Sequence, residues 1–485
     1  MISKVQSAVI SGIEGQMIEL ETHIANGMPN HVIVGLPGQV VKESKERVKS
    51  ALKVMGIRFP DTRITQNLYP AYLRKEGAHL DLPMAVGILT CMGRMNQADK
   101  RFGFIGELSL EGHIRPIKGA LSLIEGMKHA GITHIVLPEG NLNEGRYVDS
   151  VSLYPFQTLE AMVAAFESDS LSPCTPENPS FESIIQAEHF RDVIGQEGAV
   201  RAAEIAAAGF HNILFSGPPG SGKTMIARRL IGILPPPDRD ERVEIAKIKS
   251  AFEVQENFEY ASNRPLRAPH HTLTRAGMIG SLLPGEVTRA HRGILLLDEM
   301  AEFRSDVLES LREPLSTGWV NLTRHHHAVR FPARFMLVGT MNPCPCGNYF
   351  SEDVACTCTT HAVKKYIGKL SGPMLDRFDL NIYIDRVETP RGARADGNLM
   401  RLRIESAHAL RKEMEKAGTT MSYDPEVSDM ADRYYEKGKF SMRRYKKLLA
   451  LSETIALLDQ RTRVQTSDFY EAYAFGGQNR LAEVK

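Results

Sequence analysis

The sequence predicts a multidomain α/β protein, and three observations support this fold class. The chain has 485 residues, which indicates two to four domains at about 100–200 residues per domain. Residues 167–185 are rich in Ser, Pro and acidic residues and lack apolar periodicity, which is typical of a linker. Beyond it, short apolar runs alternate with helical patterns and then give way to helical patterns alone. We therefore expect domains at 1–166, 186–390 and 391–485.

The first domain combines strand-like and helix-like segments, which predicts an α+β fold. Short runs of β-branched and apolar residues indicate strands, and longer segments with helical spacing of apolar residues indicate helices. The expected strands are 5–10, 17–20, 31–34 and 134–137, and the expected helices include 40–55 and 159–166.

The second domain should hold buried parallel strands, because its apolar runs are short and bounded by helix or turn signals. A helix that follows Gly222 must end before Pro235, since proline cannot continue a helix. The third domain should be small and all-α. The expected strands are 213–215, 294–297, 335–338 and 380–384, and the expected C-terminal helices are 397–417, 425–437, 441–459 and 466–475.

The composition excludes several classes of protein. Lys and Arg number 59 against 58 Asp and Glu, so the net charge is +1 and any affinity for nucleic acid must come from local patches. The longest apolar stretch, 82–92, is shorter than the roughly 20 residues that cross a membrane. The first twenty residues do not form a secretion signal. We expect a cytoplasmic protein without a membrane span, in which the six cysteines stay reduced.

A phosphate-binding loop is predicted between the run 213–215 and the helix that follows. Glycines let backbone N–H groups turn inward around phosphate oxygens, and the next helix points its positive end at them. Lys223 would bridge the β and γ phosphates of a nucleotide, and the Thr224 hydroxyl would bind Mg²⁺. The alternative is a glycine-rich turn without a ligand. The loop is Gly217, Pro218, Pro219, Gly220, Ser221, Gly222, Lys223 and Thr224, which fits G-x-x-x-x-G-K-[ST].

Polar residues at later strand ends complete a hydrolytic site. Asp298 and Glu299 follow a buried strand, where Asp298 would hold Mg²⁺ and Glu299 would polarise the attacking water. Asn342 emerges at the same sheet edge and would orient that water, although a turn asparagine before proline has the same pattern. Arg377 is a candidate transition-state charge, and its alternative is an ion pair with Asp376 or Asp379.

These residues resemble the AAA+ ATPases of the magnesium-chelatase-like branch, specifically the YifB/ComM family. The resemblance rests on segments 192–196, 264–271, 284–293, 339–347 and 370–377 and covers nearly the whole chain. It implies a ring, usually a hexamer, with ATP bound between subunits, so that Arg377 reaches the neighbour's nucleotide. Arg443 matches the second sensor arginine of the C-terminal lid. The resemblance implies that Lys223, Thr224, Asp298, Glu299 and Asn342 act within one subunit.

The first domain resembles the proteolytic domain of the Lon protease family, through residues 81–85, 104–108 and 115–119. Lon-type proteases use a Ser nucleophile and a Lys of lowered pKa. In this sequence Met84 stands at the Ser position and Leu121 near the Lys position. We therefore expect a Lon-like fold without protease activity, kept for assembly or partner contact, although Lys118 lies close to the Lys position.

Four cysteines form a C-x-C-x₉-C-x-C pattern directly after Asn342. Four thiolates match the tetrahedral preference of Zn²⁺, although C-x-C is tighter than the usual spacing. Reduced free thiols and a redox pair are the alternatives, and His361 is a possible substitute ligand. The predicted ligands of a structural zinc are Cys344, Cys346, Cys356 and Cys358.

Basic residues between the acidic strand and Asn342 suggest contacts with DNA. The pattern of residues 319–335 predicts a hairpin with a basic tip, and in related rings such tips face the central channel. Cations there would follow a phosphate backbone without reading its sequence. A solvated surface is the alternative for each basic run, and a metal site is the alternative for the three histidines. The candidate DNA contacts are Arg324, His325, His326, His327, Arg330, Arg267 and Arg275.

Together these features predict an ATP-driven ring motor that acts on single-stranded or branched DNA. By resemblance, the function would be branch migration that assists homologous recombination in natural transformation. The alternative is a chelatase-type motor that remodels a protein partner. A third possibility, an ATP-dependent protease, is opposed by Met84 and Leu121.

Overall fold

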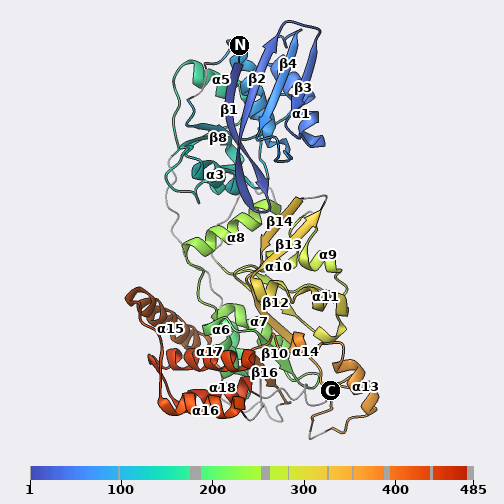
Figure 1. Ribbon diagram of the computed structural model, residues 1–485, viewed down its shortest axis with the longest axis vertical. Helices are drawn as coiled ribbons and strands as arrows, with labels where there is room; N and C mark the ends of the chain where they lie inside the picture. The colour runs from blue at the N-terminus through green and yellow to red at the C-terminus, as the bar shows by residue number, and fades with distance from the viewer. Residues whose placement is uncertain are drawn as a thin grey trace. The chain divides into compact units, whose positions relative to one another are not determined.

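The computed structural model describes residues 2–96, 99–174, 187–252, 263–281, 283–324, 327–351, 354–386, 394–436 and 441–477. They divide into two compact units. The first unit is Met1–Phe181 with Arg239–Ala261, and the second is Glu182–Asp238 with Ser262–Lys485. Figure 1 shows the helices and strands of both units, many of them labelled.

The first unit is built on a seven-stranded mixed sheet in the order β3-β4-β2-β1-β5-β8-β9. β1 and β2 form a long antiparallel pair, whereas β5, β8 and β9 run parallel. In β2, Ile18 and Leu20 are buried at alternate positions, because successive side chains of a strand point to opposite faces. The strands are β1 Ile2–Ser11, β2 Glu14–Ala25, β3 Asn30–Val34, β4 Arg63–Tyr69, β5 Phe102–Phe104, β6 Glu107–Leu108, β7 Ile114–Arg115, β8 His134–Pro138 and β9 Ser152–Phe156.

Helices complete the core of the first unit. α2 is buried from Asp81 to Thr90, which explains the apolar stretch of the sequence as a core helix. Thr158 caps α5, with its hydroxyl accepting a hydrogen bond from the Ala161 N–H at 3.2 Å. The helices are α1 Gln39–Val54, α2 Asp81–Cys91, α3 Ala120–His129, α4 Leu142–Gly145, α5 Leu159–Glu167 and α8 Arg239–Phe252.

Helix α8 belongs to the first unit, although the sequence places it within the predicted domain 186–390. It lies beside α3 (Figure 1), where the Gly119 N–H donates to the Ser250 carbonyl at 2.9 Å. The Lys247 ammonium pairs with Glu14 at 3.0 Å. The compact units thus differ from the predicted domains, because the partners of α8 lie more than 100 residues earlier in the chain.

The second unit contains a five-stranded sheet whose strands all run parallel, in the order β11-β12-β15-β10-β16. β10, β12 and β15 are buried throughout, as expected for strands covered on both faces. Four of these strands overlap the apolar runs of the sequence, and the α/β fold class is confirmed. Their bounds are β10 Ile213–Ser216, β11 Leu266–Arg267, β12 Ile294–Leu297, β15 Met336–Met341 and β16 Leu380–Tyr383.

The register of the sheet brings three strand ends together. Ser216 pairs with Met341 between β10 and β15, and Leu297 pairs with Gly339 between β12 and β15. All three strands are parallel, so the residues that follow them emerge at one edge of the sheet. In open α/β sheets that edge is where ligands bind.

The remaining elements of the second unit are helices and two small strand pairs. The α7 helix ends at Ile233, before Pro235, as predicted. β13 and β14 form the expected antiparallel hairpin, and β17 pairs with β18 within the helical C-terminal part. The bounds are α6 Glu197–Gly209, α7 Lys223–Ile233, α9 Arg275–Ile279, α10 Glu286–Arg289, α11 Ser305–Ser310, α12 Pro314–Thr317, β13 Trp319–Arg324, β14 His327–Pro332, α13 Thr360–Ile367, α14 Gly372–Leu375, α15 Gly397–Ala417, β17 Ser422–Tyr423, α16 Pro425–Glu436, α17 Met442–Leu458, β18 Arg463–Val464 and α18 Thr466–Gly476.

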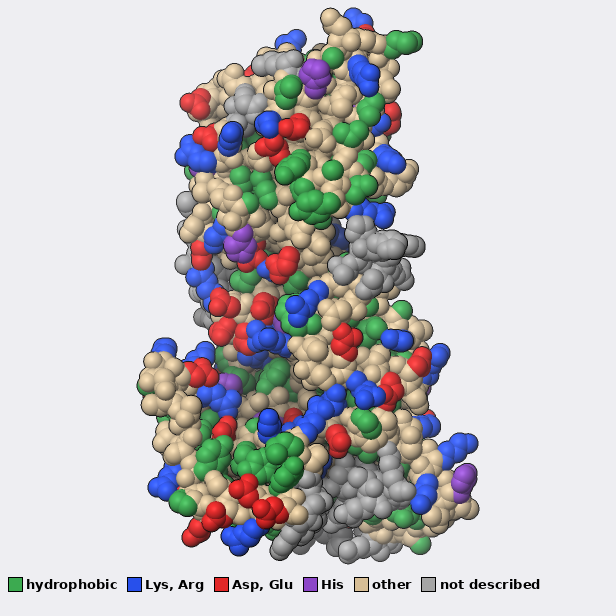
Figure 2. Space-filling model, viewed as in Figure 1, with side chains coloured by type: hydrophobic (Ala, Val, Ile, Leu, Met, Phe, Trp, Pro, Cys, Tyr) green, Lys and Arg blue, Asp and Glu red, His purple; other side chains and the backbone are tan. Residues whose placement is uncertain are grey.

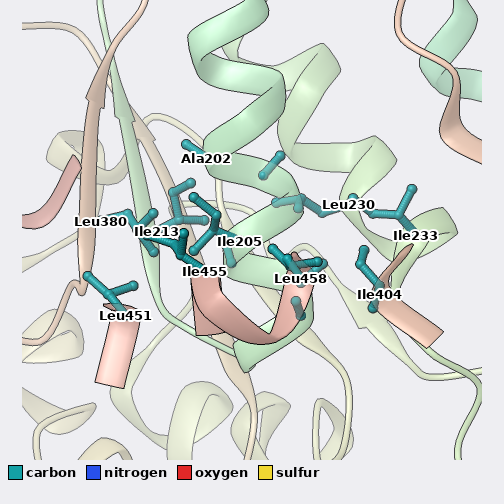
Figure 3. Packing of buried hydrophobic residues seen from close by; sticks show 14 of the residues in the cluster. Ala202, Ile205, Ile213, Leu230, Ile233, Leu380, Ile404, Leu451, Ile455 and Leu458 are labelled. Carbon is teal, nitrogen blue, oxygen red and sulfur yellow. The ribbon is translucent and has the colours of Figure 1, made fainter. Parts of the chain in front are cut away.

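The C-terminal helices share one hydrophobic core with the parallel sheet. Figure 3 shows Ile404 of α15 and Leu458 of α17 among side chains of α6, α7 and β10, including Ile205, Leu230 and Ile213. Each of these side chains is at most 3% exposed, so each contributes about 1.5–3 kcal/mol through burial. This shared core fixes the helical C-terminal part against the helix that begins with Lys223.

Candidate functional site

The phosphate-binding loop connects β10 to α7, as the sequence predicts. A Cβ at Gly217 would lie 2.0 Å from the Ile384 carbonyl oxygen, so only glycine fits there. Gly222 caps α7 with φ +90°, a conformation that also favours glycine. The first turn of α7 therefore presents its N–H groups toward the loop, the arrangement that binds phosphate.

Lys223 is the first residue of α7, and its side chain is directed back over the loop. The ammonium donates to the carbonyl oxygens of Gly217 at 2.8 Å and of Pro218 at 2.7 Å. Burial lowers the pKa of Lys223 to about 8, and the nearby carboxylates of Asp298 and Glu299 partly oppose this shift. A phosphate anion beside the ammonium would supply the missing negative charge.

Asp298 lies opposite Thr224 at the end of β12. Its Oδ1 accepts hydrogen bonds from the Thr224 hydroxyl at 2.9 Å and from the Thr340 hydroxyl at 2.6 Å. A carboxylate and a hydroxyl provide the hard oxygen ligands that Mg²⁺ requires next to a bound nucleotide. The donor set therefore fits the predicted magnesium site.

Glu299 has an unusual backbone conformation with φ +51°. Left-handed backbone at a residue other than glycine costs about 1–3 kcal/mol and occurs often at functional sites. The Glu299 N–H donates to the Thr340 hydroxyl at 3.1 Å, which holds this conformation, and the carboxylate is exposed. Thr340 thus contacts both acidic residues. No sequence motif marks Thr340 as a site residue, although its place two residues before Asn342 on a buried strand is a usable signal.

Asn342 follows the last residue of β15 and lies beside the phosphate loop. The Gly217 N–H donates to the Met341 carbonyl at 3.3 Å, which ties the start of the loop to this strand end. The structure thus places Asn342 at the sheet edge where Asp298 and the loop emerge.

Arg377 lies in the segment after α14, where its guanidinium donates to the Ser316 hydroxyl at 2.7 Å. Of its two predicted alternative partners, Asp379 pairs instead with Lys447 at 2.7 Å and accepts from the Asn212 N–H at 2.8 Å. Among the described residues of one chain, Arg377 forms no hydrogen bond or ion pair with the phosphate loop.

Arg443 lies exposed in the first turn of α17, and the neighbouring Arg444 is the more buried of the two. Burial lowers the pKa of Arg444, and Asp376 and Asp379 oppose this shift. The Lys447 ammonium also donates to the Asp376 carbonyl at 2.7 Å. Helix α17 therefore holds the segment that carries Arg377.

The four predicted zinc ligands converge. The Cys344 sulfur lies 3.4 Å from that of Cys346 and 3.7 Å from that of Cys356, and the latter two lie 3.5 Å apart. The Cys346 N–H donates to the Cys358 sulfur at 3.4 Å. All four sulfurs lie within 4.8 Å of one another, so the residues can hold a metal ion.

The predicted DNA contacts that the structure describes have different surroundings. Arg267 forms a two-pronged ion pair with Glu286 at 2.7 and 2.9 Å, whereas Arg275 is exposed at the start of α9. Arg330 is exposed on β14, with its guanidinium 4.0 Å from the centre of the Trp319 ring. His325 and His326 lie outside the described residues, as do the side chains of Arg324 and His327.

Basic and acidic side chains are interspersed over the face of the molecule that Figure 2 shows, in line with the net charge of +1. An attraction for polyanions must therefore arise from particular loops rather than from the overall charge.

The Lon-like region buries both predicted replacements of the catalytic residues. Met84 in α2 and Leu121 in α3 are 0% exposed. Lys118 is exposed, and the Lys75 side chain is fully buried and donates to the Pro70 carbonyl. The thioether of Met84 and the isobutyl group of Leu121 serve as core contacts at these positions.

The parallel strand order, the phosphate loop and the hydrogen bond between Thr224 and Asp298 define a P-loop ATPase of the AAA+ class, which uses a nucleotide and Mg²⁺. Three family models match the chain: magnesium chelatase subunit ChlI over residues 189–391, its C-terminal part over 391–475, and a second ChlI model over 20–141.

Relatives match over nearly the full length. "Competence protein ComM" of Haemophilus influenzae is 35% identical over 99% of this chain and 98% of its own length. YifB of Salmonella typhimurium is 34% identical over 97% of this chain and 96% of its own. The chain belongs to the ComM/YifB family of magnesium-chelatase-like AAA+ ATPases with a Lon-protease-like N-terminal domain, which confirms the predicted resemblance. A Lon protease of Mycoplasma mycoides is 25% identical over 29% of the chain and 19% of its own length. Among the described helices, none is both long enough and apolar enough to cross a bilayer.

Proposed function

We propose that the protein is an ATP-driven ring motor that moves along DNA. Its role would be branch migration that assists homologous recombination during natural transformation, in keeping with the competence protein to which it is similar. We place this activity in the cytoplasm, where the chain would act as a ring of six copies, by analogy with related AAA+ proteins. The ATPase part follows from the family and the site, and DNA as the partner is the proposed step.

The proposed hydrolytic chemistry divides among the residues at the sheet edge. The Lys223 ammonium neutralises the β and γ phosphates, and the α7 N-terminus binds their oxygens. Mg²⁺, held by Thr224 and Asp298, would supply charge neutralisation on the phosphates. Glu299 orients and polarises the attacking water, and Asn342 helps to place it. Structural zinc at the four cysteines completes the proposed set of cofactors.

The ring is supported by the position of Arg377. Its guanidinium is partly exposed and bonded to Ser316, so it is available to a nucleotide on a neighbouring copy. An arginine supplied from another subunit contributes on the order of 10³–10⁵ in rate to phosphoryl transfer. Arg443, exposed at the start of α17, would report the γ-phosphate to the C-terminal helices.

The observation that carries the DNA proposal is the hairpin β13–β14. It is inserted in the chain between β12, which Asp298 follows, and β15, which Asn342 follows, so it lies between the two strands that lead to the hydrolytic edge. Arg330 is exposed on it and is oriented by the Trp319 ring. A cation and an aromatic side chain on one hairpin match a nucleic-acid backbone and its bases.

A chelatase-type motor that remodels a protein partner is the second candidate. The observation that favours it is that all three matching family models describe a magnesium chelatase subunit. Full-length similarity to a competence protein favours the DNA motor over it.

The test is ATP turnover without DNA and with single-stranded, duplex or four-way-junction DNA, together with migration of a labelled junction. The motor predicts stimulation by DNA, strongest with the junction, and movement that stops in Glu299→Gln, which should still bind ATP. Arg330→Ala should weaken DNA binding. It should also reduce the slope of the logarithm of the binding constant against the logarithm of the salt concentration by about one. Arg58→Ala, an exposed arginine of the other unit, is the matched control.

The outcomes separate the candidates. ATP turnover that none of the DNA substrates stimulates, but that a large protein partner does stimulate, would support the chelatase-type motor. Degradation of casein would support a protease. A chain that stays monomeric with ATP analogue and DNA, measured by mass photometry, would contradict the ring.

A further inference from the structure

The four-cysteine cluster has the dimensions of a tetrahedral metal–thiolate site. Zinc–sulfur bonds of about 2.3 Å place the sulfurs of a regular tetrahedron about 3.8 Å apart. The sulfurs of Cys344, Cys346 and Cys356 lie 3.4, 3.5 and 3.7 Å from one another. The Cys358 sulfur lies within 4.8 Å of each of them. The sulfurs therefore surround a space that one ion can occupy with small adjustments.

The sulfur separations and the donor type favour a zinc site over a redox pair or free thiols, the alternatives that the sequence leaves open. A disulfide requires two sulfurs at about 2.0 Å, and none of the recorded pairs approaches that distance. Four soft sulfur donors select Zn²⁺ over Mg²⁺. The N–H of Cys346 on the Cys358 sulfur is the kind of outer hydrogen bond that orients a metal-bound thiolate.

The cysteine loop touches the phosphate loop at one defined point. Gly347, three residues after Cys344, has φ +86°, and a Cβ there would lie 2.3 Å from the Pro219 Cδ. The Gly347 backbone therefore packs directly on the ring of Pro219. From the segment after β16, the Arg386 guanidinium donates to the Pro219 carbonyl at 3.3 Å. Pro219 is thus contacted by the cysteine loop and by Arg386.

The cluster also joins two functional segments. Cys344 is fully buried two residues after Asn342, and Cys358 lies two residues before α13, which leads toward α14 and Arg377. A metal bound to all four sulfurs would close this loop between its first and last cysteine. Closure would restrict the backbone on both sides of Gly347, because each thiolate fixes its own residue.

We propose that the thiolates of Cys344, Cys346, Cys356 and Cys358 bind one Zn²⁺, and that the closed loop braces the phosphate loop through the contact of Gly347 with Pro219. Metal occupancy then sets nucleotide affinity. The inference rests on the proposed zinc and on the ATPase activity, and it is independent of DNA as the partner. The four thiols release their protons when the metal binds.

Metal analysis of the purified chain tests the first part. We expect one zinc per chain, lost in the Cys346→Ser/Cys356→Ser variant and retained in Cys91→Ser/Cys174→Ser, which removes the two cysteines outside the cluster. Cobalt added to metal-depleted protein should give the visible absorption of a tetrahedral thiolate site. Iron in place of zinc, or equal zinc in both variants, would overturn the assignment.

Nucleotide binding tests the brace. Gly347→Ala should keep its zinc but bind a fluorescent ATP analogue more weakly, on the order of tenfold, because its Cβ displaces Pro219. Replacing Pro219 by Ala in the same protein removes the atoms that clash and should recover part of the affinity. The zinc-free cysteine variant should show a similar loss, with folding checked by circular dichroism.

The results separate the proposals from one another. A protein with full zinc whose ATP affinity is unchanged in Gly347→Ala would refute the brace and leave the metal site. A protein without zinc would refute both. Neither result depends on DNA, so failure of the DNA experiments leaves this inference standing.

Discussion

The protonation of Lys223 should control nucleotide affinity within an accessible pH range. Burial lowers the pKa of its ammonium to about 8 in the free protein, so part of the population is neutral just above that pH. Bound phosphates favour the charged form, so binding must raise this pKa. Nucleotide binding above about pH 8 should therefore take up a proton, and affinity should fall as the pH rises.

The magnitude follows from this pKa. With a pKa of about 8, roughly nine-tenths of the ammonium is charged at pH 7 and roughly one-tenth at pH 9. If only the charged form binds well, the dissociation constant rises about tenfold between these values, or about 1.4 kcal/mol. An exposed lysine with a pKa near 10.4 would produce almost no change over this range.

The measurement is titration with a fluorescent ATP analogue at saturating Mg²⁺ from pH 7 to 9. Calorimetry in two buffers of different ionisation enthalpy should show uptake of about half a proton at pH 8. Lys223→Met, which is neutral throughout, should bind weakly with a flat pH profile. A wild-type dissociation constant that stays constant between pH 7 and 9, with no proton uptake, would refute the reasoning.

Three further predictions concern the site and the stability of the Lon-like unit. Thr340→Val should lower the ATPase kcat about tenfold, since it removes a hydrogen bond worth about 1.5 kcal/mol to Asp298, the proposed Mg²⁺ ligand, whereas Thr340→Ser should stay near wild type. Arg377→Ala and Lys223→Ala should each be inactive in steady-state assays, yet mixing them should restore part of the turnover through hybrid interfaces; no rescue at any ratio would place Arg377 in its own subunit's site. Arg47→Ala should destabilise the first unit by about 3–5 kcal/mol in urea unfolding, because it leaves the fully buried Asp81 carboxylate unpaired. Asp81→Asn should cost less, and equal losses would contradict this account.

The phosphate loop could be predicted from the sequence because its parts are contiguous. Gly217 through Thr224 form one turn and the start of one helix, so local spacing fixes their geometry. The strand ends that carry Asp298 and Asn342 were also predictable, because buried parallel strands have short apolar runs and emerge at one edge.

Other features of the site depend on residues far apart in the chain. The Thr340 hydroxyl reaches Asp298 only because β15 lies next to β12. Arg386 meets Pro219 across 167 positions. Sequence patterns report periodicity and local turns, and these contacts leave no periodic signal.

Local order in the chain thus determined the kinds of element, the phosphate loop and the spacing of the four cysteines, since each depends on neighbours within about a dozen residues. The tertiary structure alone decided that α8 packs with the first unit, where Lys247 meets Glu14, and that Gly347 packs on Pro219. Such contacts are selected by the packing and charge pairing of the complete fold, which sum over many distant residues at once.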